Sequence, residues 1–249
     1  MSRSPDTPGG CTGKLRLAAI GDLHVTEAAP HPYRELFQRI AQEADVLALC
    51  GDLTNFGKTS EADILAEDLQ ACSIPIVGVL GNHDYECGQP KEVARILHQG
   101  GLRLLDGEPI EVNGVGFAGS KGFIGGFGRY MLSAFGEPEI KSFVQASIDE
   151  NLQLESSLRM LRTERTVVVL HYAPCQDTVV GEPPEIFPFL GSARMAETID
   201  RFDGVRCVVH GHAHRGAHQG RTPRGVPVYN VAKPVLNRDL GVEFALIEV

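Results

Sequence analysis

The stretch LRLAAIGDLH, residues Leu15 to His24, joins a mostly apolar run to a polar end. An apolar run without strict alternation is typical of a strand that is buried on both faces of a sheet. The run ends in Gly21-Asp22-Leu23-His24, which offers a carboxylate and an imidazole, two groups that bind metal ions. The same design, a buried strand followed by polar side chains, is found four more times along the chain.

The five candidate strands end in similar ways. They are predicted at Leu15–Ile20, Asp45–Cys50, Pro75–Leu80, Thr166–Leu170 and Val205–Val209. The residues that follow them are Gly21-Asp22-Leu23-His24, Gly51-Asp52, Gly81-Asn82-His83-Asp84, His171 and His210-Gly211-His212-Ala213-His214. In an open α/β sheet, ligands bind outside the C-terminal ends of the strands. These side chains are therefore predicted to meet at one edge.

Amphipathic segments lie between the candidate strands. Tyr33, Leu36, Phe37 and Ile40 have helical spacing, and Ser60-Glu61-Ala62-Asp63 resembles a capping box at the start of a second helix. A long helix is predicted from about Glu137 to Arg162, with a break near Asn151 left open because the middle is polar. Alternation of strands and helices predicts an α/β fold with parallel, right-handed crossover units.

The middle and the end of the chain carry shorter candidate strands. These are Leu102–Leu105, Pro109–Val112, Val115–Ala118, Val226–Val231 and Val242–Val249. Their turn-separated spacing predicts a second, more antiparallel sheet. Residues 1–13 contain Ser, Pro, Asp, Thr and Gly and are expected to form a loose tail, with a single domain over residues 14–249.

The composition narrows the function classes. The chain has 249 residues, with 23 Lys and Arg against 32 Asp and Glu, a formal charge of −9 that disfavours extended nucleic acid as a partner. Its six cysteines form no Cys-x-x-Cys pair, and Cys50, Cys72 and Cys207 lie in or beside apolar runs, as buried free thiols do. With no apolar targeting or membrane-spanning segment, we expect a cytoplasmic protein, and a homo-oligomer is left open.

Two Asp, four His and one Asn at the strand ends form a mixed oxygen and nitrogen set. The set is Asp22, His24, Asp52, Asn82, His171, His212 and His214. It suits Mn²⁺, Fe or Zn²⁺ better than the all-oxygen sites of Mg²⁺ and Ca²⁺, and it exceeds what one catalytic zinc takes. Two ions that share a carboxylate and a hydroxide would use the whole set and would serve in-line displacement at phosphorus.

In this order, Asp-x-His, Gly-Asp-(x)4-Gly from Gly51 to Gly57, Gly-Asn-His-Asp, a lone strand-end His and Gly-His-x-His resemble the motifs of the calcineurin-like metallophosphoesterase superfamily. The resemblance runs from Gly21 to His214. It implies a four-layer α/β/β/α sandwich with two central mixed sheets and the metal site at the C-terminal strand ends. It also implies a metal-dependent phosphoric ester hydrolase that acts by attack of a metal-bridging hydroxide.

The resemblance also implies roles for individual residues. The first metal would be held by Asp22, His24, Asp52 and His214, and the second by Asp52, Asn82, His171 and His212, with Asp52 bridging. His83 would contact the phosphate beside Asn82 and protonate the leaving group as a catalytic residue. Asp84 would orient His83.

Some residues near these motifs have an ordinary explanation. His31, His98, His210 and His218 match no motif and are expected to be structural. The stretch Gly122 to Tyr130 is either a loop whose aromatic residues pack on the domain or a substrate flap with Arg129 on the phosphate. Pro183 to Pro188 would form the opposite rim or a rigid surface loop.

Among phosphate esters, a small, nucleotide-like phosphodiester is favoured as the substrate, with phosphomonoesters as the alternative. A protein Ser/Thr phosphatase resembles the chain less, because Asn55-Phe56 and Asp84 depart from the motifs of those enzymes. A DNA-processing nuclease is disfavoured by the acidic charge. A non-catalytic scaffold is disfavoured because every ligand position is filled.

Overall fold

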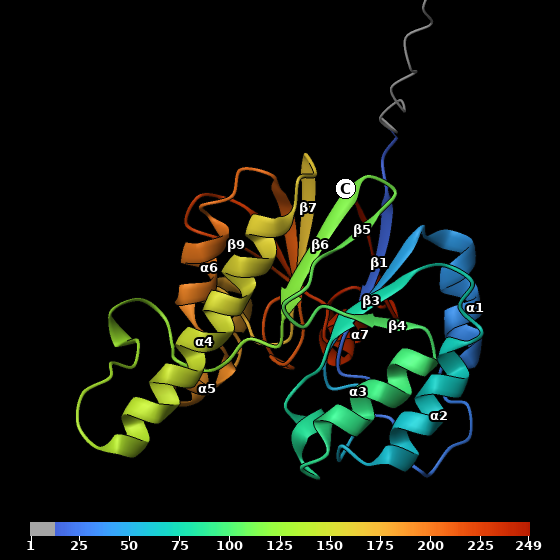
Figure 1. Ribbon diagram of the computed structural model, residues 1–249, viewed down its shortest axis with the longest axis horizontal. Coiled ribbons are helices and arrows are strands. Elements are labelled where there is room, and N and C mark those ends of the chain that lie inside the picture. Colours follow the sequence, from blue (N-terminus) through green and yellow to red (C-terminus); the bar gives the residue numbers. More distant parts are fainter. Residues whose placement is uncertain (1–12) are drawn as a thin grey trace, which may run out of the picture.

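The computed structural model describes residues 13–249 and arranges the strands in two sheets (Figure 1). The expected loose tail, residues 1–13, lies outside the described residues except for Gly13. The first sheet, in the order β11-β1-β2-β3-β4, contains β1 (Arg16–Ile20), β2 (Val46–Cys50), β3 (Ile76–Val79), β4 (Leu102–Leu104) and β11 (Ala245–Glu248). The second, in the order β5-β6-β7-β8-β10-β9, contains β5 (Ile110–Val112), β6 (Val115–Ser120), β7 (Arg165–Leu170), β8 (Val205–His210), β9 (Gln219–Arg221) and β10 (Pro227–Asn230).

The five strands that carry polar ends are confirmed, each to within one residue at either end. In the first sheet β1, β2, β3 and β4 run parallel, and β11 pairs with β1 in the opposite direction. Every residue of β2 and β3 is buried, which explains their continuous apolar sequence. The parallel direction brings the C-terminal ends of these strands to one edge.

The expected second sheet is present and has two antiparallel pairings against one in the first sheet, but most of its pairings are parallel. Its four central strands, β6, β7, β8 and β10, run parallel, and only the edge strands β5 and β9 are antiparallel. The strand expected at Leu102–Leu105 belongs instead to the first sheet, where β4 pairs in parallel with β3. Long connections between the central strands return the chain in the same direction, and short turn signals in the sequence do not reveal this.

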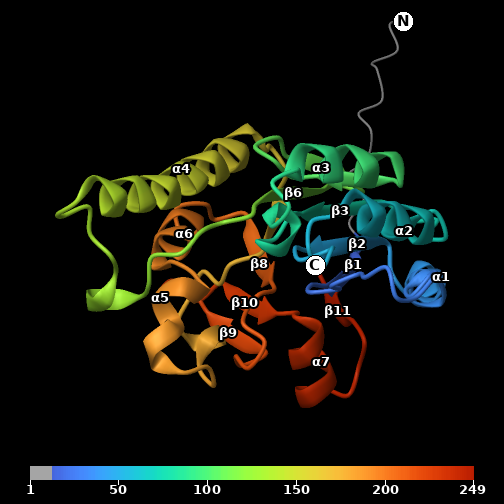
Figure 2. The ribbon, with the colours of Figure 1, turned by 90° about the horizontal axis from the view of Figure 1, so that it is seen from below.

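Helices cover the outer faces of both sheets and complete the expected four-layer sandwich (Figures 1 and 2). The first sheet is covered by α1 (Arg34–Glu43), α2 (Thr59–Leu69) and α3 (Pro90–Gln99). The second is covered by α4 (Pro138–Met160) and α6 (Ala193–Ile199), while α5 (Phe187–Leu190) and α7 (Lys233–Asp239) lie in connections. One buried cluster contains residues of both sheets, including Leu17 and Leu47 from the first and Phe117 and Val167 from the second.

One helix prediction is corrected, and another, the long helix from about Glu137 to Arg162, is confirmed. Ser60 does not cap α2, because the helix begins at Thr59 and the Ser60 hydroxyl donates to Glu27 at 2.6 Å. Glu61 alone serves the helix start, where its carboxylate accepts from the backbone N–H of Phe56 at 2.8 Å. The long helix α4 is continuous through Asn151, whose amide donates to Thr198 Oγ1 of α6 at 2.9 Å. The polar middle of α4 is thus largely half-buried and makes polar contacts, among them the Glu150 pair with Lys121 at 3.0 Å.

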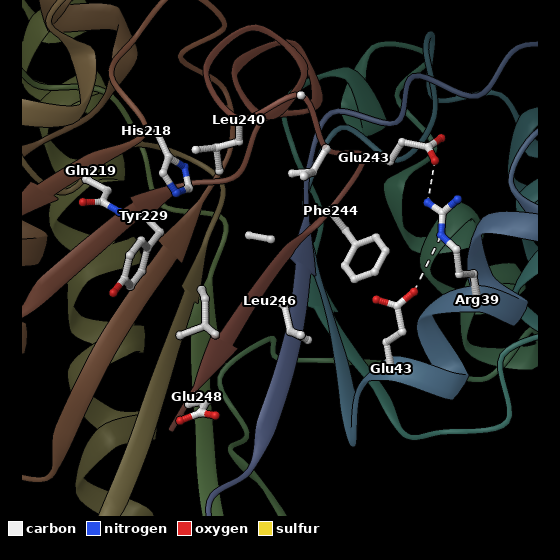
Figure 3. A pocket seen from close by; sticks show the side chains of 14 residues that line it. Arg39, Glu43, His218, Gln219, Tyr229, Leu240, Glu243, Phe244, Leu246 and Glu248 are labelled. Atoms are coloured by element: carbon white, nitrogen blue, oxygen red, sulfur yellow. Dashed lines mark hydrogen bonds and ion pairs between the residues drawn. The ribbon is translucent and has the colours of Figure 1, made fainter.

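A cavity of about 790 Å³ lies between α1, β11 and the edge formed by β9 and β10 (Figure 3). At its rim Arg39 pairs with Glu43 and Glu243, and Leu246 of the edge strand β11 faces it. None of the strand-end polar residues lines this cavity. No helix in residues 13–249 is long and apolar enough to cross a membrane.

Candidate metal centre

The polar residues predicted to meet do so at the C-terminal edge of both sheets. Backbone hydrogen bonds fix the loops that carry them: Asp22 N–H donates to Gly51 O, His24 N–H to Asp52 O, and Gly211 N–H to His171 O. Three groups of side chains have ligand atoms within 4.8 Å of one another. They are Asp22 with His24 and His214, His24 with Asp52 and His83, and Asp52 with His171 and His212.

The backbone at these residues is strained. Six described residues other than glycine have a positive φ, and four of them are Asp22 at 59°, His24 at 46°, Asp52 at 50° and His212 at 69°. Such conformations cost about 1–3 kcal/mol each and persist where the surrounding structure enforces them, often at functional sites. The strain in this protein is therefore concentrated where the candidate ligands are.

Glycines let the loops approach closely. A Cβ at Gly81 would overlap the Asp52 carboxylate, and a Cβ at Gly211 would overlap the carboxylate of Asp22. The sequence predicts that glycines before the ligands allow sharp turns. At these two positions the structure instead requires glycine because a carboxylate of another strand end occupies the space.

Hydrogen bonds to carbonyl groups orient three of the histidine rings. His171 Nδ1–H donates to Cys50 O at 2.9 Å, His212 Nε2–H to Phe189 O at 3.1 Å, and His83 Nδ1–H to Asn55 O at 2.7 Å. In a neutral ring, each of these bonds leaves the other nitrogen with its lone pair free for a metal ion or a proton. The sequence did not reveal Cys50, Asn55 or Phe189 as partners, because a backbone carbonyl has no residue signature.

The lone pairs of three atoms converge around His171. Its Nε2 lies 2.9 Å from Asn82 Oδ1 and 3.3 Å from Asp52 Oδ1. With Nδ1 donating to Cys50, Nε2 of the neutral ring faces two oxygen acceptors without a proton to share. A cation at this point would satisfy all three atoms. In addition, His24 Nδ1 is buried without a hydrogen-bond partner in the described residues. The donor set therefore fits bound metal.

The ionisation of the side chains agrees with this fit. Burial lowers the pKa of His24 to about 4 and that of His212 to about 3, so both rings are neutral at neutral pH, the form that binds metal. Burial opposes ionisation of Asp22, but the hydrogen bond that His214 Nε2–H donates at 2.8 Å helps to lower its pKa. Burial and the neighbouring Asp22 raise the pKa of Asp52. A cation would favour the charged form of both carboxylates.

The expected role of Asp84 in orienting His83 is not what the structure shows. The buried Asp84 carboxylate accepts from the backbone N–H groups of Gly81 and Thr54, both at 2.8 Å, and from the Thr54 hydroxyl at 2.6 Å. Asp84 thus ties the loop after β3 to the loop after β2, and Asn55 O holds the His83 ring. His83 Nε2 lies 4.0 Å from Asp52 Oδ2 on the partly exposed side of the cluster.

The Gly122 to Tyr130 stretch shows features of a packed loop. Phe127 is buried, Gly125 N–H donates to Pro188 O of the second candidate rim, and Gly126 N–H donates to Gly191 O beyond that rim. The Arg129 guanidinium lies 4.7 Å from the Tyr130 ring, on which it stacks, and it donates to the Tyr130 hydroxyl at 2.5 Å. His210 and His218 bind only protein groups: His210 Nε2 contacts Thr178 Oγ1 at 2.8 Å and His218 Nδ1 contacts Asn230 O at 2.9 Å.

An α/β sandwich with carboxylate, imidazole and amide groups gathered at its strand ends belongs to the class of metal-dependent hydrolases. Residues 15–216 match the model of the calcineurin-like phosphoesterases, and the chain belongs to this family. Members of this family use divalent metals, and the Asp and His groups at the strand ends fit metal binding.

Two relatives carry the name probable cyclic nucleotide phosphodiesterase. The protein from Moraxella catarrhalis is 29% identical over 64% of this chain and 57% of its own length, so the match spans little more than half of that relative. The protein from Synechococcus is 25% identical over 83% of this chain and 76% of its own length. A similar solved structure is phosphopantetheinyl hydrolase from Mycobacterium tuberculosis, at 16% identity, a TM-score of 0.67, and coverage of 94% of this chain and 96% of that one. The last likeness establishes the fold.

Proposed function

We propose that this protein is a phosphodiesterase with two metal ions bridged by Asp52. One ion would be held by Asp22, His24, Asp52 and His214, and the other by Asp52, Asn82, His171 and His212. The observation that carries the proposal is the position of the Asp52 carboxylate: Oδ1 faces His171 Nε2 at 3.3 Å, and Oδ2 faces His24 Nε2 at 3.9 Å. Each oxygen thus points to a different ligand group. The mixed nitrogen and oxygen set favours Mn²⁺, Fe or Zn²⁺.

The bound metal ions and His83 would have different roles in hydrolysis. When bound, the metal pair supplies positive charge for the phosphate oxygens and a nucleophilic water. His83 is the group placed to move a proton, because Asn55 O fixes its Nδ1–H and its Nε2 faces the cluster from the partly exposed side. Protonation of the leaving oxygen by His83 Nε2 would assist cleavage by general acid catalysis.

A small phosphodiester of the nucleotide class is the proposed substrate. Both curated relatives are named for cyclic nucleotides, and this supports the same class for this chain. The formal charge of −9 would repel a long polyanion, whereas two ions confine positive potential to one site that a single phosphate can reach. Phosphomonoesters are the alternative that the assay must distinguish.

The test is hydrolysis of bis(p-nitrophenyl) phosphate and p-nitrophenyl phosphate by protein loaded with Mn²⁺, together with metal content by mass spectrometry. We expect two ions per chain and faster cleavage of the diester. Asp52→Asn should lower kcat/KM at least about a hundredfold, because even residues that only support a ligand cost 10–100-fold. Asp63→Asn, the same change on the exposed face of α2, should have no effect.

Equal activity of Asp52→Asn and the unmodified chain would refute the proposal, as would a content of one ion per chain at saturation. Faster cleavage of the monoester would show that phosphomonoesters, and not phosphodiesters, are the substrate class.

A further inference from the structure

A second cavity, of about 200 Å³, lies at the C-terminal ends of β3, β4 and β6. Leu80, Ala94 and Leu105 supply apolar walls, and Tyr85, Asp106 and Lys121 supply polar groups. Its place at the shared edge of the two sheets is where α/β proteins bind ligands. A mostly apolar hollow with a few polar groups is the usual character of a small-molecule site.

The cavity adjoins the candidate metal centre through the loop after β3. Leu80 and Tyr85 line it, and Asn82 and His83 lie between them in the chain. On the opposite wall, Lys121 Nζ lies 5.6 Å from the Tyr85 ring and 5.4 Å from the Tyr172 ring. The Tyr172 ring is in turn 4.3 Å from the His212 ring. One tyrosine ring therefore separates the cavity wall from a candidate metal ligand.

Lys121 is a fixed part of this wall. Its ammonium group pairs with Glu150 Oε1 at 3.0 Å and donates to Gly122 O at 2.7 Å, and its side chain is only 14% exposed. The Phe123 ring lies 4.9 Å from the same nitrogen. Because these partners satisfy the ammonium, Lys121 shapes the cavity rather than competing with the metal centre for phosphate.

The mouth of the cavity offers both hydrogen-bond donors and acceptors. Among the described residues, the Tyr85 hydroxyl and Asp106 Oδ2 have no hydrogen-bond partner, although Asp106 Oδ1 accepts from Gln153 at 2.5 Å. Burial and the carboxylates of Glu150 and Asp106 raise the pKa of Tyr85 to about 12, so the hydroxyl keeps its proton and can donate. The Tyr85 side chain is 43% exposed, which leaves part of the ring free for stacking.

We propose that this cavity binds the nucleobase of the substrate while its phosphate lies at the metal centre. A nucleobase is flat, presents a π-face to the Tyr85 ring and carries N–H donors on its edge for the Asp106 carboxylate. The volume admits one such ring and little more. The inference rests on the proposed function, because it assigns the substrate class of the same site.

Adenosine tests the cavity separately from hydrolysis, because it carries the base but no phosphate. We expect calorimetry to detect adenosine binding to both metal-loaded and metal-depleted protein. Ala94→Leu, which fills the cavity from α3, should weaken binding at least about ten-fold. Gln99→Leu, on an exposed position of the same helix, should leave binding unchanged.

Tyr85→Ala should also weaken adenosine binding about ten-fold through the loss of stacking, while Tyr85→Phe should keep most of it. If Ala94→Leu does not fold, the two Tyr85 variants test whether the cavity binds adenosine. The absence of adenosine binding, or equal binding by Ala94→Leu and Tyr85→Ala, would overturn the inference even if phosphodiesters are hydrolysed. Adenosine binding without any hydrolysis would instead reject the proposed function.

Discussion

The two sheets of the molecule contribute different chemistry to the same edge. The first sheet supplies all the candidate oxygen ligands, and the second supplies histidines alone. From the first sheet come Asp22, His24, Asp52, Asn82 and His83. From the second come His171, His212 and His214. The full set of candidate ligands is therefore assembled only where the two edges meet, because two of the three ligand groups combine residues from both sheets.

Contacts between the sheets build the site directly. His171 of the second sheet donates to Cys50 O of the first, and His214 Nε2–H donates to Asp22 Oδ1. The backbone N–H of His212 also faces the Asp22 carboxylate, at 3.1 Å from both oxygens. The candidate metal centre therefore depends on the packing of one sheet against the other.

The largest effect on stability is expected when the core between the sheets is emptied. Phe117 of β6 is fully buried in the cluster that both sheets share. Phe117→Ala should lower the free energy of unfolding by about 3–5 kcal/mol, through lost apolar burial and the cavity left behind. Chemical denaturation measures it, with Phe135→Ala, at a residue 86% exposed, as the matched control. A loss below about 1 kcal/mol would show that the sheets do not rely on this contact.

The next effect concerns a side chain that joins the two edges. His171→Ala removes the imidazole that contacts Cys50 O, Asn82 and Asp52 together. We expect kcat/KM to fall at least about a hundredfold and bound metal to fall from two ions to one. Steady-state kinetics and metal analysis measure this, beside His98→Ala on the outer surface of α3. Unchanged metal content would place the centre within the first sheet alone.

A smaller effect on stability and on metal binding is expected from a change at Asn230 in the second sheet. Buried Asn230 at the end of β10 donates to Ala213 O at 2.7 Å, between His212 and His214, and accepts from Ala232 N–H at 3.1 Å. Asn230→Ala leaves these groups without partners and should cost about 1–3 kcal/mol of stability, with weaker metal binding. Thermal unfolding with and without Mn²⁺ separates the two effects. Exposed Asn237→Ala should change neither, and equal behaviour of the two variants would contradict this role.

The smallest effect is expected far from the edge. Asn151→Ala removes the single hydrogen bond to Thr198 between α4 and α6 and should cost about 0.5–1.5 kcal/mol without altering kcat/KM. Gln145→Ala, on the exposed face of the same helix, serves as the control. A loss of activity in Asn151→Ala would mean that the outer helices are coupled to the site.

From the sequence, the convergence of the strand-end residues was predicted more accurately than the assignment of strands to the two sheets. His171 follows a buried apolar run directly, and Asp22 and Asp52 each follow one after a single glycine, so local sequence indicates their position. The membership of β4 in the first sheet depends on long-range packing, which has no local signature. For the same reason the sequence could not identify Phe189 O as the partner of His212, Asp84 as a tie between loops, or the cavity lined by Tyr85.

The pairing of β1 with β11 has a consequence for folding. Arg16 of β1 lies opposite Glu248 of β11. One edge of β1 therefore has no partner strand until the C-terminal residues are synthesised. Contacts between such distant residues slow folding and leave strand edges open in the meantime. During translation the edge of β1 stays unpaired until Ala245 to Glu248 are synthesised, and an unpaired strand edge can pair with other chains.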